Sequence, residues 1–585
     1  MRRMILLALV SAVAATLLVP AATSGPTNSE TQEYVVLYER GATLEAARAA
    51  VKRLGGTIVK ENRAIGLATV SSANDDFVLE AVAQPALFGA ASNRPIGSVG
   101  PQKRQKFSEE RLDAERNASA RRGLQTASEG EVAGSGEFET FAPLQWDMQM
   151  IGATRHESHA VQEGKRSVRV GILDTGIDAS HPDIAPNFNR ALSRNFTTDI
   201  PSVQGPCEED PSETCEIPID DVPTACADEP DGSCSDPADV DENGHGTHVA
   251  GTVGAAVNGL GIAGVAPKIT LVNLRAGQDS GYFFLQPTVD ALTFAGDHGI
   301  DVVNMSYYID PWLFNCRDNP ADSPEAQAQQ RTIIAATNRA LRYAHARDVT
   351  LIAAAGNGHT NYDEKNAIVD ETSPDFPPGT EYPREITSGC KDLPTEGPDV
   401  ISVTALGPST VKADYSDYGR NHAAVSAPGG YFRDYLGTPW HQTPGNMILS
   451  AYAENVGREL GEIDENGEPT NEFVLKDCEG DTCAYYTYFQ GTSMASPHAV
   501  GVAALIVSKY GSGDPRHGGL MLDPDRTERI LYRTARDHAC PKPRTLSYED
   551  VGRGPEYTAF CSGTKERNGF YGNGIVNAYT AVLGN

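Results

Sequence analysis

The stretch SVRVGILDTGID, residues 167–178, decides the fold. Residues 168–173 are apolar enough to form a buried strand, and Asp174 follows directly, before a glycine. Further along the chain, short apolar runs alternate with helical stretches, as at 249–257, 270–274, 300–305, 332–346, 350–355 and 400–405. This alternation predicts an α/β fold, a doubly wound and mostly parallel sheet with helices on both faces. Such sheets present functional side chains beyond the carboxyl ends of their strands, where Asp174 falls.

Two more segments carry chemistry, Asn243-Gly-His245-Gly-Thr-His and Gly491-Thr-Ser493-Met-Ala-Ser-Pro. His245 and Ser493 each begin a small-residue or apolar run with helical character, and a helix N-terminus offers N–H groups to a developing oxyanion. A serine hydroxyl is a weak nucleophile that needs an imidazole to take its proton and a carboxylate to orient that imidazole. Taken singly, the three residues are typical of a turn, a loop and a helix cap. Taken together, they predict a nucleophilic serine site.

These segments resemble the active-site motifs of the subtilisin-like serine proteases (subtilases), in the family's order of Asp, His and Ser. The resemblance includes His181-Pro-Asp183 and extends over most of 141–585, to the closing Tyr571-Gly-Asn-Gly-Ile-Val-Asn. It implies a serine endopeptidase that works through an acyl-enzyme, with Asp174 as the orienting carboxylate, His245 as general base and acid, and Ser493 as nucleophile. It implies no cofactor for the chemistry.

The strand-like run 350–357 ends in Asn357. The resemblance implies that this side chain donates an N–H to the oxyanion, beside the backbone N–H of Ser493. It also aligns residues 303–309 with the strand that pairs with extended substrate, so we expect substrate contacts at Ser306, Tyr307, Tyr308 and Gly356. Family members commonly carry glycine after the serine. Tyrosines at this place predict narrower subsites and a more selective enzyme.

A structural calcium site is a further implication of the resemblance, with Asp183 and Asn258 at the matching positions. Oxygen ligands suit a hard cation. The alternative, two polar residues without an ion, stays open. His248 lies three residues after His245 but has no H-E-x-x-H pattern or cysteine partner, so we expect a core histidine and no zinc site.

Residues 1–24 have a charged start, an apolar run and a small-residue end, which predicts a secretory signal peptide. A membrane anchor is the alternative, but the apolar run of about 15 residues is shorter than the ~20 needed to span a bilayer. No later stretch is apolar enough to span. We therefore expect a secreted, extracellular protein without a stable membrane anchor.

All 10 cysteines lie between Cys207 and Cys561, and an even number in an exported chain predicts disulfides. Local pairs are expected at Cys478/Cys483 and Cys540/Cys561, and a longer pair at Cys316/Cys390. The cysteines at 207, 215, 226 and 234 are expected to pair among themselves. The sequence leaves the connectivity open. The spacings lack the paired C-x-x-C of a zinc cluster.

The chain of 585 residues has a net charge of −30, which argues against nucleic acid and anionic membranes as partners. Residues 30–100 predict a small α+β domain without cysteine, with a strand at 34–38 and a helix at 43–54. This domain resembles the propeptides that precede subtilase catalytic domains, so we expect an inhibitor of the chain's own enzyme. Residues 101–140, which contain Arg121-Arg122 as a candidate cleavage site, predict a linker.

The predicted catalytic domain, 141–585, contains an acidic cysteine-rich insertion at 207–242 and loop-like stretches at 358–397 and 430–485. We expect a monomer made as an autoprocessed zymogen that hydrolyses peptides or proteins. A selective processing protease for particular precursor peptides is one alternative. A catalytically silent peptide-binding protein is another, although no triad member is substituted. An α/β-hydrolase is disfavoured because Ser493 lies in G-T-S-M-A and not in G-x-S-x-G.

Overall fold

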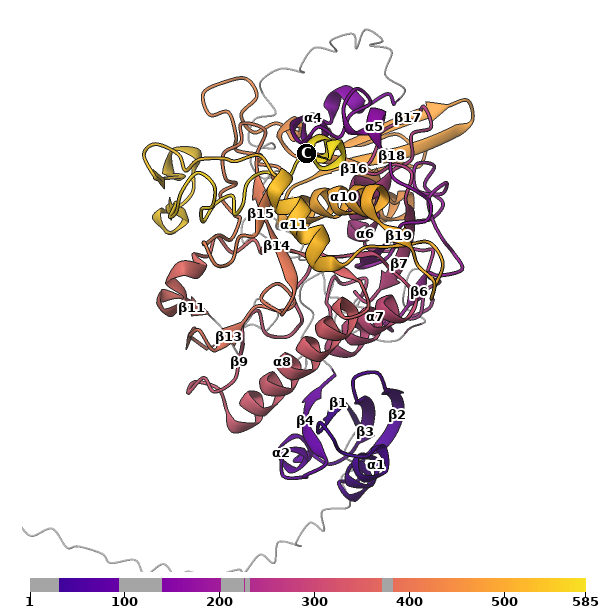
Figure 1. Cartoon of the computed structure of the whole chain (residues 1–585), viewed down its shortest axis with the longest axis vertical. Helices are drawn as coiled ribbons and strands as arrows, with labels where there is room; N and C mark the ends of the chain where they lie inside the picture. Colours follow the sequence, from indigo (N-terminus) through magenta and orange to yellow (C-terminus); the bar gives the residue numbers. More distant parts are fainter. Residues whose placement is uncertain (1–30, 94–138, 201–225, 227–231, 371–381, 585) are drawn as a thin grey trace, which may run out of the picture.

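The computed structural model describes residues 31–93, 139–200, 226, 232–370 and 382–584. The predicted signal peptide, the candidate cleavage site at Arg121-Arg122 and most of the acidic insertion lie outside these residues. Figure 1 shows a large α/β body and a smaller α+β unit, which lies beneath helices α7 and α8.

The large body is built on a parallel sheet with the strand order β15-β14-β10-β8-β5-β7-β6, which confirms the predicted α/β fold. Its strands are β5 (Arg169–Leu173), β6 (Arg194–Asn195), β7 (Thr270–Arg275), β8 (Val302–Met305), β10 (Thr350–Ala354), β14 (Val400–Leu406) and β15 (Val425–Pro428). From β5 the chain forms β6 and β7 on one side of the strand and then crosses to form β8, β10, β14 and β15 on the other side, so the switch point lies between β5 and β8. Open α/β sheets bind their ligands in the crevice outside the strand ends at that point.

Helices cover both faces of the sheet, which is why its strands read as continuous apolar runs. Helices α6 (His245–Gly254) and α10 (Thr492–Tyr510) pack on one face, with Val170 and Ile172 of β5 in the same core cluster. Helices α7 (Leu285–Asp297) and α8 (Pro324–His345) pack on the other face, against Leu173. The smaller helices are α4 (Trp146–Ile151), α5 (Ser158–Val161), α9 (Glu454–Glu459), α11 (Pro524–Thr534) and α12 (Ala578–Leu583).

The expectation of a loop at 430–485 was wrong. The region contributes β16 (Ile448–Tyr452), β17 (Val474–Glu479) and the first half of β18 (Thr482–Phe489) to an antiparallel sheet with the order β16-β18-β17. The glycine and acidic residues between these strands dominate the local composition and hide the short strand patterns. Helix α7 was not predicted either. By contrast, the described part of 358–397 has only two-residue strands: β11 (Val369–Asp370), β12 (Arg384–Glu385) and β13 (Cys390–Lys391).

The described residues contain four disulfides, of which Cys316–Cys390, Cys478–Cys483 and Cys540–Cys561 confirm the predicted pairs. The fourth joins Cys226 to Cys234 within the acidic insertion. Cys207 and Cys215 lie outside the described residues.

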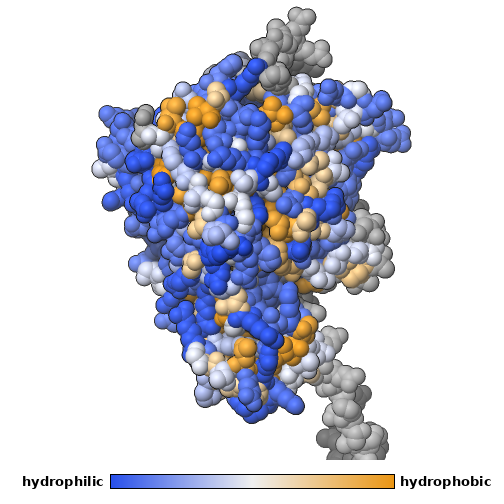
Figure 2. Space-filling model, turned by 45° about the vertical axis from the view of Figure 1, so that its right-hand side comes forward, coloured by the Kyte–Doolittle hydropathy of each residue, from blue (hydrophilic) through white to orange (hydrophobic). Residues whose placement is uncertain are grey.

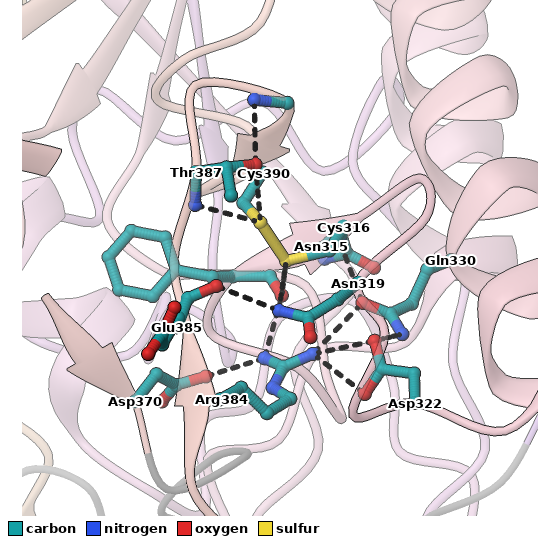
Figure 3. Close-up of a disulfide and its surroundings, with 12 residues drawn as sticks. Asn315, Cys316, Asn319, Asp322, Gln330, Asp370, Arg384, Glu385, Thr387 and Cys390 are labelled. Carbon is teal, nitrogen blue, oxygen red and sulfur yellow. Dashed lines mark hydrogen bonds and ion pairs between the residues drawn. A yellow bond between two sulfur atoms is a disulfide. The ribbon is translucent and has the colours of Figure 1, made fainter. Parts of the chain in front are cut away.

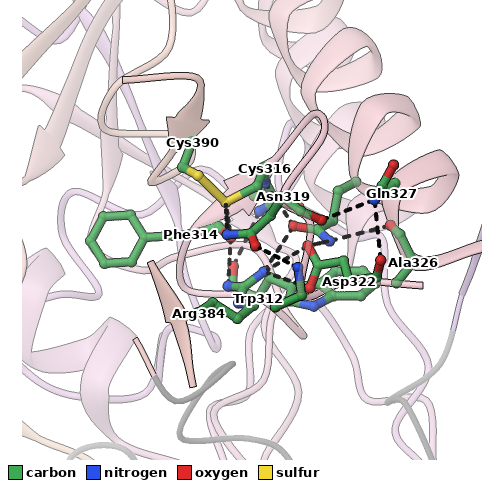
Figure 4. Close-up of polar contacts among 12 residues, drawn as sticks. Trp312, Phe314, Cys316, Asn319, Asp322, Ala326, Gln327, Arg384 and Cys390 are labelled. Atoms are coloured by element: carbon green, nitrogen blue, oxygen red, sulfur yellow. Dashed lines mark hydrogen bonds and ion pairs between the residues drawn. A yellow bond between two sulfur atoms is a disulfide. The ribbon is translucent and has the colours of Figure 1, made fainter. Parts of the chain in front are cut away.

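The disulfide Cys316–Cys390 joins β9 (Asn315–Cys316) to β13 (Figure 3). Beside it, the buried guanidinium of Arg384 lies between Asp322 and Asp370 and donates to the carbonyl of Phe314 at 2.9 Å. On the α8 side of this cluster, Gln327 donates to the carbonyl of Asn319 at 2.9 Å (Figure 4). The crosslink and the ion pairs therefore tie β9, β13 and the start of α8 into one unit.

The small unit is an antiparallel sheet with the order β2-β3-β1-β4 and two helices. Its elements are β1 (Gln32–Tyr38), α1 (Leu44–Arg53), β2 (Thr57–Asn62), β3 (Leu67–Ser72), α2 (Phe77–Val82) and β4 (Leu87–Ser92). Thr43 caps α1 because its hydroxyl oxygen accepts the N–H of Ala46 at 3.1 Å. The strand and helix expected at 34–38 and 43–54 are thus present, within one to two residues at each end.

The surface is mainly hydrophilic, with scattered apolar residues in the face that Figure 2 shows. Among the described residues, no helix combines the length and the apolar character needed to cross a bilayer.

Candidate active site

His245 and Asp174 meet at the carboxyl end of β5. Asp174 follows the strand directly and is fully buried, and its Oδ1 lies 2.7 Å from Nδ1 of His245. The same oxygen accepts the backbone N–H of Thr175 at 2.8 Å. A carboxylate on Nδ1 fixes the tautomer that leaves Nε2 able to accept a proton.

Glycines allow the two motifs to pack backbone against backbone. A Cβ on Gly246 would lie 2.0 Å from the carbonyl oxygen of Gly176, and a Cβ on Gly176 would lie 2.6 Å from that of Val240. Asp241 fixes the start of α6, because its Oδ2 accepts the N–H of Thr247 at 3.0 Å and its Oδ1 accepts that of Gly244 at 2.9 Å. The sequence analysis did not single out Asp241.

Ser493 lies in the first turn of α10 and is 8% exposed. Its backbone carbonyl accepts the hydroxyl of Ser306, the residue after β8, at 3.1 Å. The hydroxyl of Ser496 lies 2.7 Å from that of Ser306 and 2.8 Å from the side-chain oxygen of Asn304 on β8. This buried network, whose members Asn304 and Ser496 were not predicted, fixes the start of α10 against the strand next to β5.

Asn357 lies on an exposed turn three residues beyond β10, the next strand in the sheet. Its Oδ1 accepts both the backbone N–H of Thr492 at 2.9 Å and the Thr492 hydroxyl at 2.8 Å. Because the oxygen is held on the Thr492 side, the amide NH2 is turned the other way. Asn357 is thereby coupled directly to the residue that precedes Ser493.

The expected substrate residues lie around the same strand ends. The ring of Tyr307 stacks on Phe283 with centroids 4.1 Å apart, and both Tyr307 and Tyr308 are half-buried. Burial raises the pKa of Tyr307 above its usual value. Gly356 has φ +106°, a conformation that favours glycine. The expected substrate residues therefore lie just beyond the carboxyl ends of two neighbouring strands: Ser306, Tyr307 and Tyr308 follow β8, and Gly356 follows β10.

Asp183 and Asn258, the expected calcium ligands, do lie together, with Asn258 Nδ2 3.0 Å from Asp183 Oδ1. Asp183 is fully buried, and its Oδ2 accepts the Tyr486 hydroxyl at 2.8 Å and the N–H of Ile262 at 3.3 Å. Both carboxylate oxygens are therefore engaged by protein donors, and the amide group facing Asp183 is an NH2, which is no metal ligand. As arranged, these residues fit a hydrogen-bonded loop anchor better than a cation site. Calcium binding here stays a prediction, which melting temperatures with and without a chelator would test.

Among the described residues, three acidic side chains converge at one other place, Asp199, Asp236 and Asp279. The centre is taken by Arg275, which is fully buried and pairs with Asp199 at 2.9 Å and with Asp279 at 2.7 Å, and also with Asp236. The guanidinium supplies the positive charge that these carboxylates need. The cluster is connected to the active-site segment through Asn243, which lies two residues before His245. The side-chain amide of Asn243 donates to the backbone carbonyl of Asp279 at 2.7 Å.

His248 is a buried core histidine, as expected. Its Nε2 lies 3.1 Å from the carbonyl of Ile448 and 3.2 Å from that of Thr487, and its ring stacks on Phe489. Burial lowers the pKa of His248 to about 3, so the ring stays neutral. It links α6 to the β16–β18 sheet.

The parallel sheet, its switch point and the contact of His245 with Asp174 there are those of a subtilisin-like serine endopeptidase. The Subtilase family model matches residues 165–574, and the chain belongs to that family. Subtilases act on peptides or proteins and need no cofactor for catalysis.

Two curated relatives are similar over most of the catalytic body. Subtilisin DY of Bacillus licheniformis is 27% identical over 346 residues, which is 59% of this chain and 78% of the relative. The nisin leader peptide-processing serine protease of Lactococcus lactis subsp. lactis is 26% identical over 395 residues, 67% of this chain and 48% of the relative. Among solved structures, the epidermin leader peptide processing serine protease of Staphylococcus aureus shares the fold, with a TM-score of 0.57 and 20% identity over 95% of this chain and 99% of that one.

Proposed function

We propose that the chain is a secreted serine endopeptidase, made as a zymogen, in which Asp174, His245 and Ser493 form the catalytic triad. The observation that carries this proposal is the 2.7 Å contact between Asp174 and His245 at the switch point, with Ser493 fixed to the adjacent strand end. Asp174 holds His245 in the tautomer whose Nε2 accepts a proton.

In the proposed mechanism, Ser493 Oγ attacks the substrate carbonyl carbon while His245 takes its proton. The tetrahedral oxyanion is stabilised by the Asn357 NH2 and by the backbone N–H of Ser493 at the positive end of α10. When the C–N bond breaks, His245 gives the proton to the leaving amine. Water then attacks the acyl-enzyme, with His245 again as base.

Labelling with a fluorophosphonate tests the proposal. Wild-type enzyme should incorporate one label and Ser493→Ala none, with loss of casein cleavage. Ser508→Ala is the matched control, because Ser508 is a fully buried serine at the far end of the same helix. Labelling of Ser493→Ala at the wild-type level would exclude Ser493 as the nucleophile.

We propose that the 31–93 unit is an inhibitory propeptide. It shares a core cluster with α7 and α8 through side chains such as Val35, Leu37 and Leu67. Polar contacts border this cluster: Asn62 donates to Asp290 at 2.8 Å, and Arg339 donates to the carbonyl of Tyr38 at 2.7 Å.

This unit contains no cysteine, so it can leave without breaking a disulfide. N-terminal sequencing of secreted protein should find a start between about residues 100 and 145, beyond the whole docked unit and at or after the predicted linker. A mature protein that retains Tyr34 would contradict this role, and a cell-retained protein would contradict secretion. Size-exclusion chromatography should give a monomer.

A selective processing protease is a second candidate. Two of the similar proteins are named for leader-peptide processing, and the stacking of Tyr307 on Phe283 fixes a bulky ring beside the site. Peptide-library profiling should then show a strong preference N-terminal to the cut. Indifference at those positions would favour a general endopeptidase.

A further inference from the structure

Asp417 is a buried carboxylate behind the turn that carries Asn357. It lies on the segment after β14 and is 4% exposed. Its Oδ1 accepts the backbone N–H of Thr360 at 2.6 Å, and its own backbone N–H donates to the carbonyl of Gly356 at 2.9 Å. These two bonds bracket Asn357 on either side.

The contact between Asp417 and the turn leaves no room for a side chain at position 356. A Cβ on Gly356 would lie 2.2 Å from Asp417 Oδ2, and one on Gly358 would lie 3.4 Å from Oδ1. A further hydrogen bond joins the two segments, because the backbone N–H of Tyr418 donates to the Thr360 carbonyl at 3.0 Å. The backbone of the turn is therefore fixed by the segment that Asp417 belongs to.

Asp417 interacts electrostatically with a second buried ionisable group, Lys412, whose own pKa burial lowers to about 7. Lys412 is 1% exposed, donates to the carbonyl of Ala413 at 2.9 Å and lies 4.9 Å from the ring centroid of Tyr418. Attraction to Lys412 favours the ionised form of Asp417, although burial has the larger effect and raises the pKa of Asp417 to about 7. An ionised carboxylate only accepts hydrogen bonds, which suits a place faced by backbone N–H groups.

We propose that Asp417 is a positioning residue for the oxyanion site: it holds the 356–360 turn so that the Asn357 NH2 meets the developing charge. The inference rests on the proposed role of Asn357. Thr492 orients the Asn357 side chain, and Asp417 fixes the backbone from which that side chain extends. A preorganised donor is effective only when it is held within about 0.5 Å of the productive position.

The test compares Asp417→Asn with Asp301→Asn. Asp301 is also 4% exposed and accepts a backbone N–H, that of Arg169 at 2.8 Å, but it precedes β8 and therefore lies at the amino ends of the strands, opposite the site. Both variants replace a buried carboxylate, so their stability losses should be alike. Activity is measured with a quenched peptide built on the best-cut sequence of a casein digest.

Asp417→Asn should lower kcat on the order of 10- to 100-fold, a fraction of the 10²–10³ that one oxyanion donor supplies in this family, with KM changed less than about threefold. Asp301→Asn should keep kcat. Asp417→Ser, which removes the buried charge with a small side chain, serves if Asp417→Asn does not fold, and the same loss is expected.

A double-mutant cycle identifies the route of the effect. Asn357→Ala alone should lose about 10²–10³ in kcat, and adding Asp417→Asn should cost less than about threefold more. If the losses in kcat of the two single variants multiply in the double variant, or if kcat is unchanged in both Asp417 variants, the positioning role is overturned while the proposed function stays intact. Full kcat in Asn357→Ala would overturn both the positioning role of Asp417 and the oxyanion role of Asn357.

Discussion

Replacing Arg275 by methionine tests what holds the segment before His245 in place. Arg275 is fully buried and its guanidinium neutralises Asp199, Asp236 and Asp279 together. Methionine keeps much of the volume and removes the charge. Three carboxylates would then share a buried space without a cation.

The expected cost follows from the charge that is left behind. Removing one partner of a buried ion pair costs about 3–5 kcal/mol, and here three carboxylates lose the same partner. Even with Arg275 present, burial raises the pKa of Asp199 to about 6 and holds that of Asp279 well above its usual value. In the variant these pKa values rise further. A raised carboxyl pKa destabilises the fold as pH climbs above the unfolded value near 4, so the loss should be larger at pH 8 than at pH 5.

Urea unfolding is the assay, with every protein carrying Ser493→Ala to prevent self-digestion. Arg275→Met should lower the free energy of unfolding by at least about 3 kcal/mol at pH 8, and by less at pH 5. The free energy of unfolding of Arg275→Lys should lie between those of the wild type and Arg275→Met, because one ammonium cannot replace the planar guanidinium that contacts three carboxylates. A loss under about 1 kcal/mol at pH 8, or an equal loss at both pH values, would refute this account.

Three further predictions use the same inactive background. His248→Gln should reduce the loss in free energy of unfolding on acidification by about 1.4 kcal/mol per pH unit between pH 6.5 and 4. The reason is that burial lowers the pKa of His248 to about 3, so the unfolded chain binds the proton first. Equal slopes of unfolding free energy against pH, measured with urea for the two proteins, would contradict this. Removing the disulfide Cys316–Cys390, whose cysteines are 74 residues apart, should lower the free energy of unfolding by about 2 kcal/mol more than removing Cys478–Cys483, whose cysteines are 5 apart. Similar losses in the two variants would exclude the loop-closure explanation. Arg339→Ala should speed amide hydrogen exchange in β1 and β3 about tenfold, because it removes a charged donor on α8 that binds carbonyls of the docked unit. Arg347→Ala should leave the exchange rates unchanged, and equal rates in the two variants would exclude Arg339 as an anchor.

Much of the candidate site could be predicted from the sequence because each motif is short and lies where a strand or helix boundary is itself predictable. Asp174 follows an apolar strand, and Ser493 begins an apolar helix. Asp417 gave no such signal. Its hydrogen-bond partner Thr360 is 57 residues away, and only the fold brings the two together.

The same reason explains the other omissions. Arg275 meets Asp199 across 76 residues, and no local pattern marks either residue as half of a buried pair. The strands within 430–485 were hidden because turn residues outnumber strand residues there. The N-terminal unit was predicted more fully because its β1, α1 and β2 follow one another with clear caps and short turns.

The first histidine of the chain is His156, so the unit that covers α7 and α8 has no imidazole of its own. The polar groups at that contact include Lys60 with Asp290 and the guanidinium of Arg339. The unit therefore brings to this contact no imidazole, the side chain that ordinarily gains its proton between pH 8 and 5. Cleavage of the chain is irreversible, whereas protonation is reversible. An enzyme that is inhibited by this unit and released by cleavage would therefore be activated permanently.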